Sequence, residues 1–218
     1  LSGPTDAALA SMTVAELRGV AAEQPRSYPV QLALGHALRQ AGEFDDATAA
    51  FQRAAALVPT ATGAGSPHPQ LAAMAAERGD RARVQAELQA VVQTDFNNVD
   101  AARQLVAELT RASVTDPARL RPLYLRIVAI DPYDADAHAA LGRMAMQRED
   151  FDAASREFRV VLALEPADRA GAHTDLAESY LRAGRRPEAR IETLKALELA
   201  PTFERAQELL LTLVDGAR

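Results

Sequence analysis

The sequence predicts an all-α fold built from repeated helix pairs, and three observations support this prediction. Alanine, the strongest helix former, is abundant, whereas aromatic residues make up only 5% of the chain. Long runs of β-branched residues, which favour strands, are absent from the 218 residues. Prolines recur at intervals of 34 or 35 residues, a period typical of helical repeats stacked into a solenoid.

The prolines mark where each repeat is expected to end. Pro25 and Pro59 are 34 residues apart, as are Pro132 and Pro166, and Pro201 follows Pro166 by 35 residues. The residue before a proline avoids the helical region of backbone space. We therefore expect the second helix of a repeat to end just before each of the last four of these prolines.

The pair Leu-Gly occurs twice with a Phe 16 residues after the glycine. We expect Gly35 and Gly142 to let two antiparallel helices approach closely. Phe51 and Phe158 are expected to fill the gap that remains between these helices. Gly42 is expected at the tight turn between the two helices, where a left-handed backbone costs little only for glycine.

The chain resembles the tetratricopeptide repeat (TPR) family in these motifs: Leu-Gly in a first helix, Gly with an acidic and an aromatic residue at a turn, Ala-x-x-x-Phe in a second helix, and then Pro. The resemblance implies a right-handed α-solenoid of helix-turn-helix repeats with terminal capping helices. It assigns an N-terminal cap to residues 1–27, a C-terminal cap to 204–218, and five repeats to 28–61, 65–98, 99–134, 135–168 and 170–203. The third repeat departs from the family pattern, because Val106, Leu120 and Ile127 stand where small residues are preferred.

The expected helices follow from this register. The pairs are 31–41 with 44–57, 69–78 with 81–94, 100–112 with 116–130, 135–148 with 151–164, and 170–183 with 187–199. Thr13 and Glu16 form a capping-box sequence, which predicts a further helix to about Gln24 that covers the first repeat. Residues 204–214 predict a last amphipathic helix, in which Leu209, Leu210 and Val214 are available to cover the fifth repeat.

The composition argues against several classes of function. A net charge of −6 and a pI near 5.3 argue against a general nucleic-acid binder. The absence of cysteine excludes disulfides and thiolate metal sites, and no apolar stretch approaches the roughly 20 residues needed to span a bilayer. The sequence shows no signal peptide and begins at Leu1, so we expect a processed chain or a fragment, soluble in the cytoplasm or the periplasm.

The histidines are expected to pack rather than to bind a metal. His68, His138 and His173 fall at the first-helix position where the family has a large side chain, and one histidine per repeat is not metal-ligand spacing. His36 is expected to point toward the groove. The Gly-rich loop 62–67 lacks the Gly-Lys-Ser/Thr of a phosphate-binding loop and indicates a linker. No catalytic residue, cofactor or metal is predicted.

The TPR resemblance places the outward-pointing residues of each first helix on an inner, concave face. We call these residues the inner row: Leu32, His36, Arg39, Gln40, Ala73, Ala76, Glu77, Arg103, Ala107, Thr110, Arg111, Arg143, Met146, Gln147, Thr174, Glu178, Leu181 and Arg182. Five arginines against two glutamates make it net basic, and arginine suits carboxylates. The alternative is a coding bias toward arginine, since only one of the 24 basic residues is a lysine.

We therefore predict a non-catalytic scaffold that holds a protein or peptide on the inner row, with an acidic or C-terminal segment as the favoured ligand. The alternative is an accessory domain of a larger enzyme, because TPR arrays similar to this one occur attached to peptidases and glycosyltransferases. RNA-binding helical repeats are a third class, and the low pI argues against them. The sequence leaves the partner and the oligomeric state open, and predicts neither nucleic acid nor membrane insertion.

Overall fold

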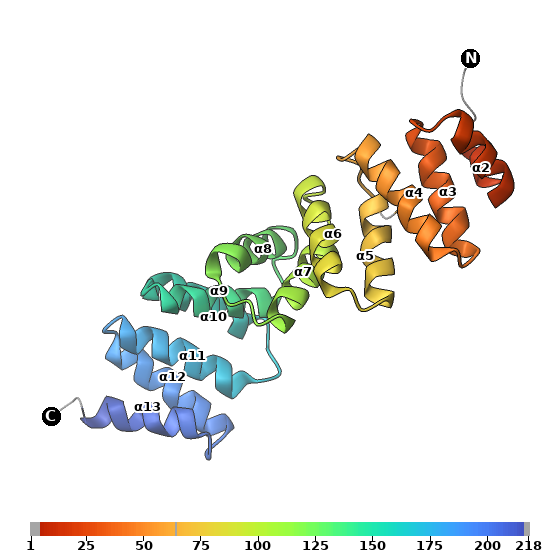
Figure 1. The fold of residues 1–218 in the computed structure, drawn as a ribbon. Helices are drawn as coiled ribbons and strands as arrows, with labels where there is room; N and C mark the ends of the chain where they lie inside the picture. Colours follow the sequence, from red (N-terminus) through yellow and green to blue (C-terminus); the bar gives the residue numbers. More distant parts are fainter. Residues whose placement is uncertain (1–4, 64, 216–218) are drawn as a thin grey trace. The chain divides into compact units, whose positions relative to one another are not determined.

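The computed structural model of the chain describes residues 5–63 and 65–215 (Figure 1). In this part of the chain the structure consists of thirteen helices joined by short loops, and it contains no strand. The predicted all-α fold of stacked helix pairs is therefore confirmed.

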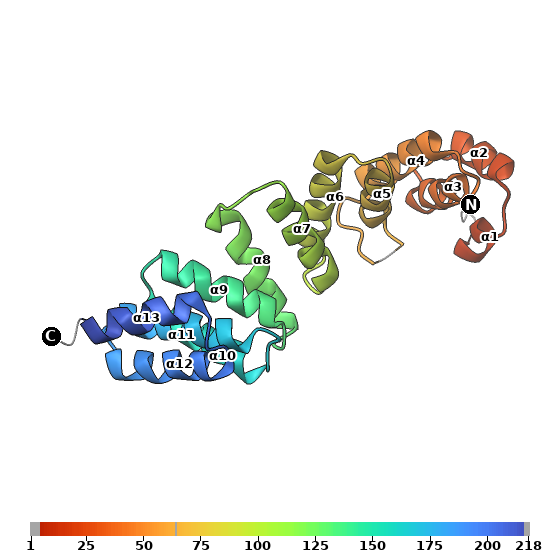
Figure 2. The same cartoon turned by 90° about the horizontal axis from the view of Figure 1, so that it is seen from below.

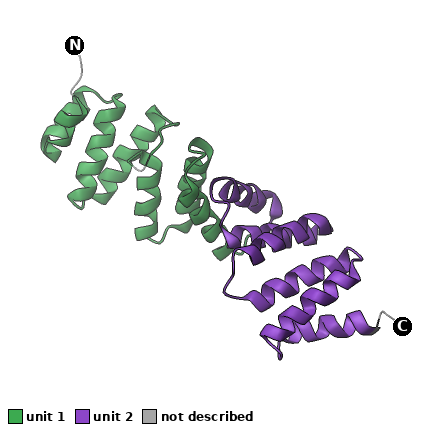
Figure 3. Cartoon of the chain, turned by 180° about the vertical axis from the view of Figure 1, so that it is seen from behind, with its two compact units in different colours: residues 1–114 green, residues 115–218 purple. Residues whose placement is uncertain are grey.

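The chain divides into two compact units, which Figure 3 distinguishes by colour. Unit 1, residues 1–114, holds α1 (Asp6–Ala10), α2 (Val14–Glu23), α3 (Tyr28–Gln40), α4 (Phe44–Leu57), α5 (Pro67–Glu77), α6 (Arg81–Thr94) and α7 (Val99–Arg111). Unit 2, residues 115–218, holds α8 (Pro117–Ile130), α9 (Ala135–Gln147), α10 (Phe151–Ala163), α11 (Arg169–Arg182), α12 (Arg186–Leu199) and α13 (Glu204–Asp215). The division falls inside the predicted third repeat, 99–134, and the five repeat boundaries themselves stay predictions.

The predicted helices agree with the observed ones to within three residues at each end. The largest difference is at α3, which begins at Tyr28 rather than at residue 31. Pro29 lies in the first turn of α3, where the missing amide hydrogen of proline costs nothing because first-turn amides have no partner within the helix. Pro29 therefore lies inside the first turn of α3, two residues before the predicted start of the helix.

Within each unit, helices pack on their neighbours in the chain. In unit 1, α2 packs on α3, α3 on α4, α4 on α5, α5 on α6, and α6 on α7. In unit 2 the same order runs from α8 through α13. Helix α1 also packs on α3, and Figure 2 shows it lying alongside that helix.

The close approach expected at the two glycines is confirmed. A Cβ added to Gly35 would lie 2.7 Å from the Phe51 ring, and one added to Gly142 would lie 2.5 Å from the Phe158 ring. Both distances are shorter than carbon atoms tolerate, so only glycine leaves room for the ring. Phe51 is fully buried and Phe158 is 2% exposed, which makes each ring the centre of its helix pair.

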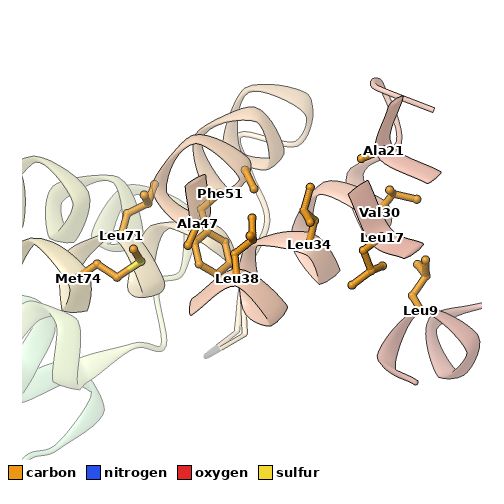
Figure 4. Close-up of a cluster of buried hydrophobic side chains, with 11 residues drawn as sticks. Leu9, Leu17, Ala21, Val30, Leu34, Leu38, Ala47, Phe51, Leu71 and Met74 are labelled. Atoms are coloured by element: carbon orange, nitrogen blue, oxygen red, sulfur yellow. The ribbon is translucent and has the colours of Figure 1, made fainter. Parts of the chain in front are cut away.

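The hydrophobic core of unit 1 is continuous from the N-terminal helices to α5 (Figure 4). Leu9 of α1 and Leu17 of α2 pack with Leu34 and Leu38 of α3, and the cluster extends to Met74 of α5. Helices α1 and α2 therefore cover the end of the first predicted repeat, as a capping region should.

Both chain ends carry caps. The predicted capping box is present, since the Thr13 amide donates to the Glu16 carboxylate at 2.8 Å and the Glu16 amide donates to Thr13 Oγ1 at 3.3 Å. At the other end Leu209 is buried, as predicted, but Val214 is 51% exposed. The prediction for Val214 is wrong because Leu213, four residues after Leu209, continues the buried stripe and turns Val214 toward solvent.

Candidate functional site

Three histidines form the same contact in three helix pairs. Nδ1 of His68 lies 2.7 Å from Glu87, Nδ1 of His138 lies 2.7 Å from Glu157, and Nδ1 of His173 lies 2.6 Å from Glu192. Each pair joins a first helix to the second helix that follows it, and each histidine side chain is less than one fifth exposed. The prediction that these histidines pack within the repeats is confirmed.

The carboxylate partners were missed by the sequence prediction, although a signal for them exists. In all three pairs the glutamate follows the histidine by 19 residues, which places the two side chains across one helix-turn-helix. No group of three or more His, Cys, Asp or Glu side chains that could hold a metal ion occurs among residues 5–63 and 65–215.

In two repeats the side chain at this first-helix position also contacts the loop before the helix. His138 Nε2 lies 3.1 Å from the carbonyl oxygen of Pro132. In the first predicted repeat Gln31 occupies this position and donates to the carbonyl of Pro25 at 3.3 Å. A polar side chain here therefore bonds the carbonyl of the proline six residues earlier, which is a structural task and not a contact with a ligand.

The inner row lines three hollows on the surface. The largest, about 710 Å³, lies between α1, α2 and α3 and includes Leu32, His36 and Gln40. We call it the N-terminal hollow. A second hollow of about 450 Å³ in unit 1 lies between α5, α6 and α7, and its inner-row members are Ala73, Ala76, Ala107 and Arg111. A third, about 380 Å³ in unit 2, is formed by α9, α10, α11 and α13 and includes Arg143, Met146, Gln147 and Glu178.

The inner-row arginines of unit 1, Arg39, Arg103 and Arg111, are already paired with acidic side chains of the protein. Arg39 donates to Gln70 at 2.6 Å and to Glu77 at 2.9 Å. Arg103 lies 3.6 Å from Asp100.

Arg111 and Arg81 both bind Glu108. Partial burial opposes ionisation of Glu108, but the hydrogen bonds from these two arginines outweigh it and lower the pKa of that carboxyl. Arg111 is therefore matched by a stable negative charge one turn away.

In unit 2 the two predicted arginines differ. Arg182 lies 3.9 Å from Glu149, and its guanidinium stacks over the Phe151 ring at 5.1 Å. Arg143 is exposed and has no ion-pair partner among the described residues. The expectation of an unneutralised arginine row is thus wrong for Arg39, Arg103, Arg111 and Arg182, because carboxylates on the same helix or on a neighbouring helix reach them.

The two threonines predicted on the inner row differ in their exposure. Thr174 is fully buried, and its hydroxyl donates to the carbonyl of Ala170 at 2.9 Å. Its prediction as a ligand contact is wrong, since no partner can reach it. Thr110, by contrast, is exposed on the last turn of α7.

Arg205 on α13 was missed, because the prediction treated that helix only as a cap. It donates to Asp175 at 2.7 Å and to Glu178 at 3.1 Å, both on α11, and lines the unit 2 hollow with them. Partial burial opposes its charge, but these two carboxylates outweigh that effect and raise the pKa of Arg205. The last helix thus contributes to the same surface as the first helices of the repeats.

Comparisons with known proteins agree with this architecture. The family model described as "Tetratricopeptide repeat" matches residues 32–64. YrrB, a protein of known structure, superposes with a TM-score of 0.54 at 17% identity, covering 90% of this chain and 98% of YrrB. MamA superposes with a TM-score of 0.50 at 20% identity, covering 78% of this chain and 90% of MamA. A search of curated protein sequences finds no match.

These likenesses to solved structures concern the fold alone, because the identities are low. YrrB is described as a TPR protein with an unusual peptide-binding site. In the described part of the chain no helix combines the length and apolar character needed to cross a membrane. The repeated Gly–Phe contacts and the neighbour-to-neighbour helix packing agree with these comparisons: residues 32–64 match a tetratricopeptide repeat, and the fold is similar to that of solved TPR proteins.

Proposed function

We propose that the chain is a non-catalytic scaffold that holds a segment of another protein against the inner row. The observation that carries this proposal is the coincidence of the inner row with hollows in both units. Between α5 and α7 the row consists largely of alanines, so the surface is set back and leaves room for a ligand. The peptide-binding site reported for YrrB, which shares the fold, is consistent with this role.

The charge of the partner is a finer part of the proposal. Because the arginines of unit 1 already face carboxylates, an acidic ligand gains little there. Arg143 in unit 2 is exposed and lines a hollow beside Met146 and Gln147. We propose that an acidic side chain or a C-terminal carboxylate of the partner binds at Arg143.

Site-specific photo-crosslinking tests the scaffold proposal. A benzophenone amino acid placed at Ala73, Ala107 or Gln147 should crosslink one partner segment from an extract of the cells that make the protein. Matched positions at Ala86 on α6 and Ala163 on α10, which are exposed but lie outside the inner row, should give little of that product. Equal yields from both sets of positions, or none from the inner row, would contradict the proposal.

The acidic preference needs its own test once that segment is known. Arg143→Glu should weaken binding of the crosslinked segment several-fold and flatten its dependence on salt, because one attractive charge becomes repulsive. Arg159→Glu, on the exposed side of α10, is the matched control and should leave the affinity unchanged. Unchanged affinity in the Arg143 variant would contradict the acidic preference and favour the alternative, in which a coding bias explains the arginines of the inner row.

A further inference from the structure

We propose that the N-terminal hollow is a socket for a large apolar side chain of the partner, flanked by a lysine or arginine. This inference rests on the proposed function, since it names what one part of the inner row binds. It differs from the sequence prediction, which favoured an acidic or C-terminal segment as the ligand.

The hollow is built mainly from apolar side chains of three helices. Its volume of about 710 Å³ is the largest among the three inner hollows and lies within the range of about 300–1,000 Å³ typical of ligand sites. Its apolar walls are Leu9 and Ala10 of α1, Met12 of the following turn, Leu17 of α2, and Pro29, Leu32, Ala33 and Ala37 of α3. Burying an apolar side chain there would remove both surfaces from water.

The walls are rigid because they belong to the core. Leu9 and Leu17 are members of the hydrophobic cluster of unit 1, and Met12 and Leu32 pack against it. His36 is fixed on two sides, since its Nε2–H donates to the carbonyl of Gly65 at 3.0 Å and its ring meets the Phe51 ring edge-on. A preformed socket of this kind loses little conformational entropy on binding.

The charge of the occupant follows from Asp6. It is the one acidic or basic residue, histidine aside, that lines the hollow, and it forms no ion pair within the described residues. The other polar groups of the wall come from Tyr28, His36 and Gln40. Burial raises the pKa of Tyr28, so its hydroxyl stays neutral.

A single unpaired carboxylate beside an apolar wall therefore favours a cation next to an apolar group. An acidic group at the same place would be repelled by Asp6 and would gain only the apolar contact. The net charge of −6 on the whole chain adds a weak long-range attraction for a basic segment.

Three capped peptides separate the contributions of shape and charge. The first is acetyl-Gly-Ser-Leu-Leu-Lys-Ser-Gly-amide; the second has Glu in place of Lys, and the third has Ser-Ser in place of Leu-Leu. Each is titrated into the full ¹⁵N-labelled chain while amide shifts are followed in two-dimensional NMR spectra. We expect the first peptide to shift the amides of Leu9, Met12, Leu32 and His36, and to bind about two- to fivefold more tightly than the Glu peptide, which is the strength of one exposed ion pair. The Ser-Ser peptide should not bind detectably.

Two variants and a control identify the groups responsible. Asp6→Asn should abolish the preference for Lys over Glu, and Leu32→Gln should weaken both leucine peptides. Asp136→Asn is the matched control, because Asp136 also lies in the first turn of a helix but in unit 2. The amide spectra themselves show whether each variant is folded.

The outcomes separate this inference from the proposed function. Equal or tighter binding of the Glu peptide, or a preference for Lys that survives Asp6→Asn, would overturn the socket. Shifts confined to Ala73, Ala107 or Gln147 would overturn it too, while leaving the inner row as a binding surface. Loss of inner-row crosslinks would instead remove the proposed function on which the socket depends.

Discussion

The first and fourth predicted repeats, one in each unit, follow the same sequence pattern but differ at the turn between their two helices. They share the contact between a glycine and a phenylalanine ring, so close that an added Cβ would lie 2.7 Å from the ring at Gly35 and 2.5 Å from it at Gly142. At the turn between helices the first repeat has Gly42, with a positive φ of 79°, whereas the fourth has Glu149, with a φ of 59°.

This difference shows that the fold requires glycine at the close approach of the helices but only favours it at the turn. A Cβ at the close approach would overlap a buried ring, so no other residue fits without moving a helix. A left-handed turn residue other than glycine costs only about 1–2 kcal/mol, and the fold tolerates Glu149 there. Position within the repeat therefore decides how much of the family pattern must be kept.

The largest expected effect is the loss of a ring. Phe158→Ala should cost about 3–5 kcal/mol, because it leaves a cavity between α9 and α10, and Phe51→Ala should cost a similar amount in unit 1. Urea denaturation followed by circular dichroism measures both. Tyr133→Ala, at a loop residue that is 79% exposed, is the control and should change stability by less than about 0.5 kcal/mol. Equal effects of all three would show that the rings do not organise the repeats.

Filling the glycine site tests the same contact from the other side. Gly142→Leu should cost about 1–3 kcal/mol or more, since the added atoms overlap the Phe158 ring. Hydrogen exchange should show the lost protection in residues 115–218, while the amides of α3 and α4 stay protected. Gly19→Ala in α2 is the control, because the added Cβ meets nothing within 4 Å. This variant should stabilise the helix by about 0.5–1 kcal/mol. Loss of protection along the whole chain would contradict independent units.

The first-helix polar position allows a graded test. His138→Ala should cost about 1–3 kcal/mol, because it removes the ring that contacts both Glu157 and the carbonyl of Pro132. His138→Gln should cost less, since Gln31 forms the equivalent bond to Pro25 in the first repeat. Thermal denaturation of the two variants compares them directly. A glutamine variant as unstable as the alanine variant would show that the loop bond contributes little.

The smallest expected effect is at the turn. Glu149→Gly should stabilise unit 2 by up to about 1 kcal/mol, because glycine adopts the positive φ without strain. Loss of the long 3.9 Å contact to Arg182 offsets little of this gain, since both side chains are exposed. Gly42→Ala should destabilise unit 1 by a comparable amount. We expect the melting temperature to rise in the Glu149→Gly variant and to fall in the Gly42→Ala variant. Shifts in the same direction would refute the comparison.

Backbone features were predictable from the sequence because they follow from period, proline and glycine. Both ends of the helices 44–57 and 81–94 were predicted correctly. The residues that form the Gly–Phe contacts were also predicted correctly. The partners of side chains were not predictable from the sequence. The ion pairs of Arg39 and Arg111 depend on which carboxylates lie within reach after the helices have packed. The prediction for Thr174 was wrong for a related reason, because the repeat register alone does not tell whether a neighbouring helix covers a position.

The division between α7 and α8 also escaped prediction. It falls in the predicted repeat where Val106 takes the place that Gly35 and Gly142 hold in the first and fourth repeats.

The neighbour-to-neighbour packing of the helices has a consequence for protein synthesis. Helices in extensive contact are adjacent in the chain or one helix apart, so the relative contact order is low and folding should be fast. The core of unit 1 extends from Leu9 to Met74 and needs no residue from the second half of the chain. Unit 1 can therefore fold while the ribosome is still translating unit 2, which limits the time that its apolar helix faces are exposed to aggregation.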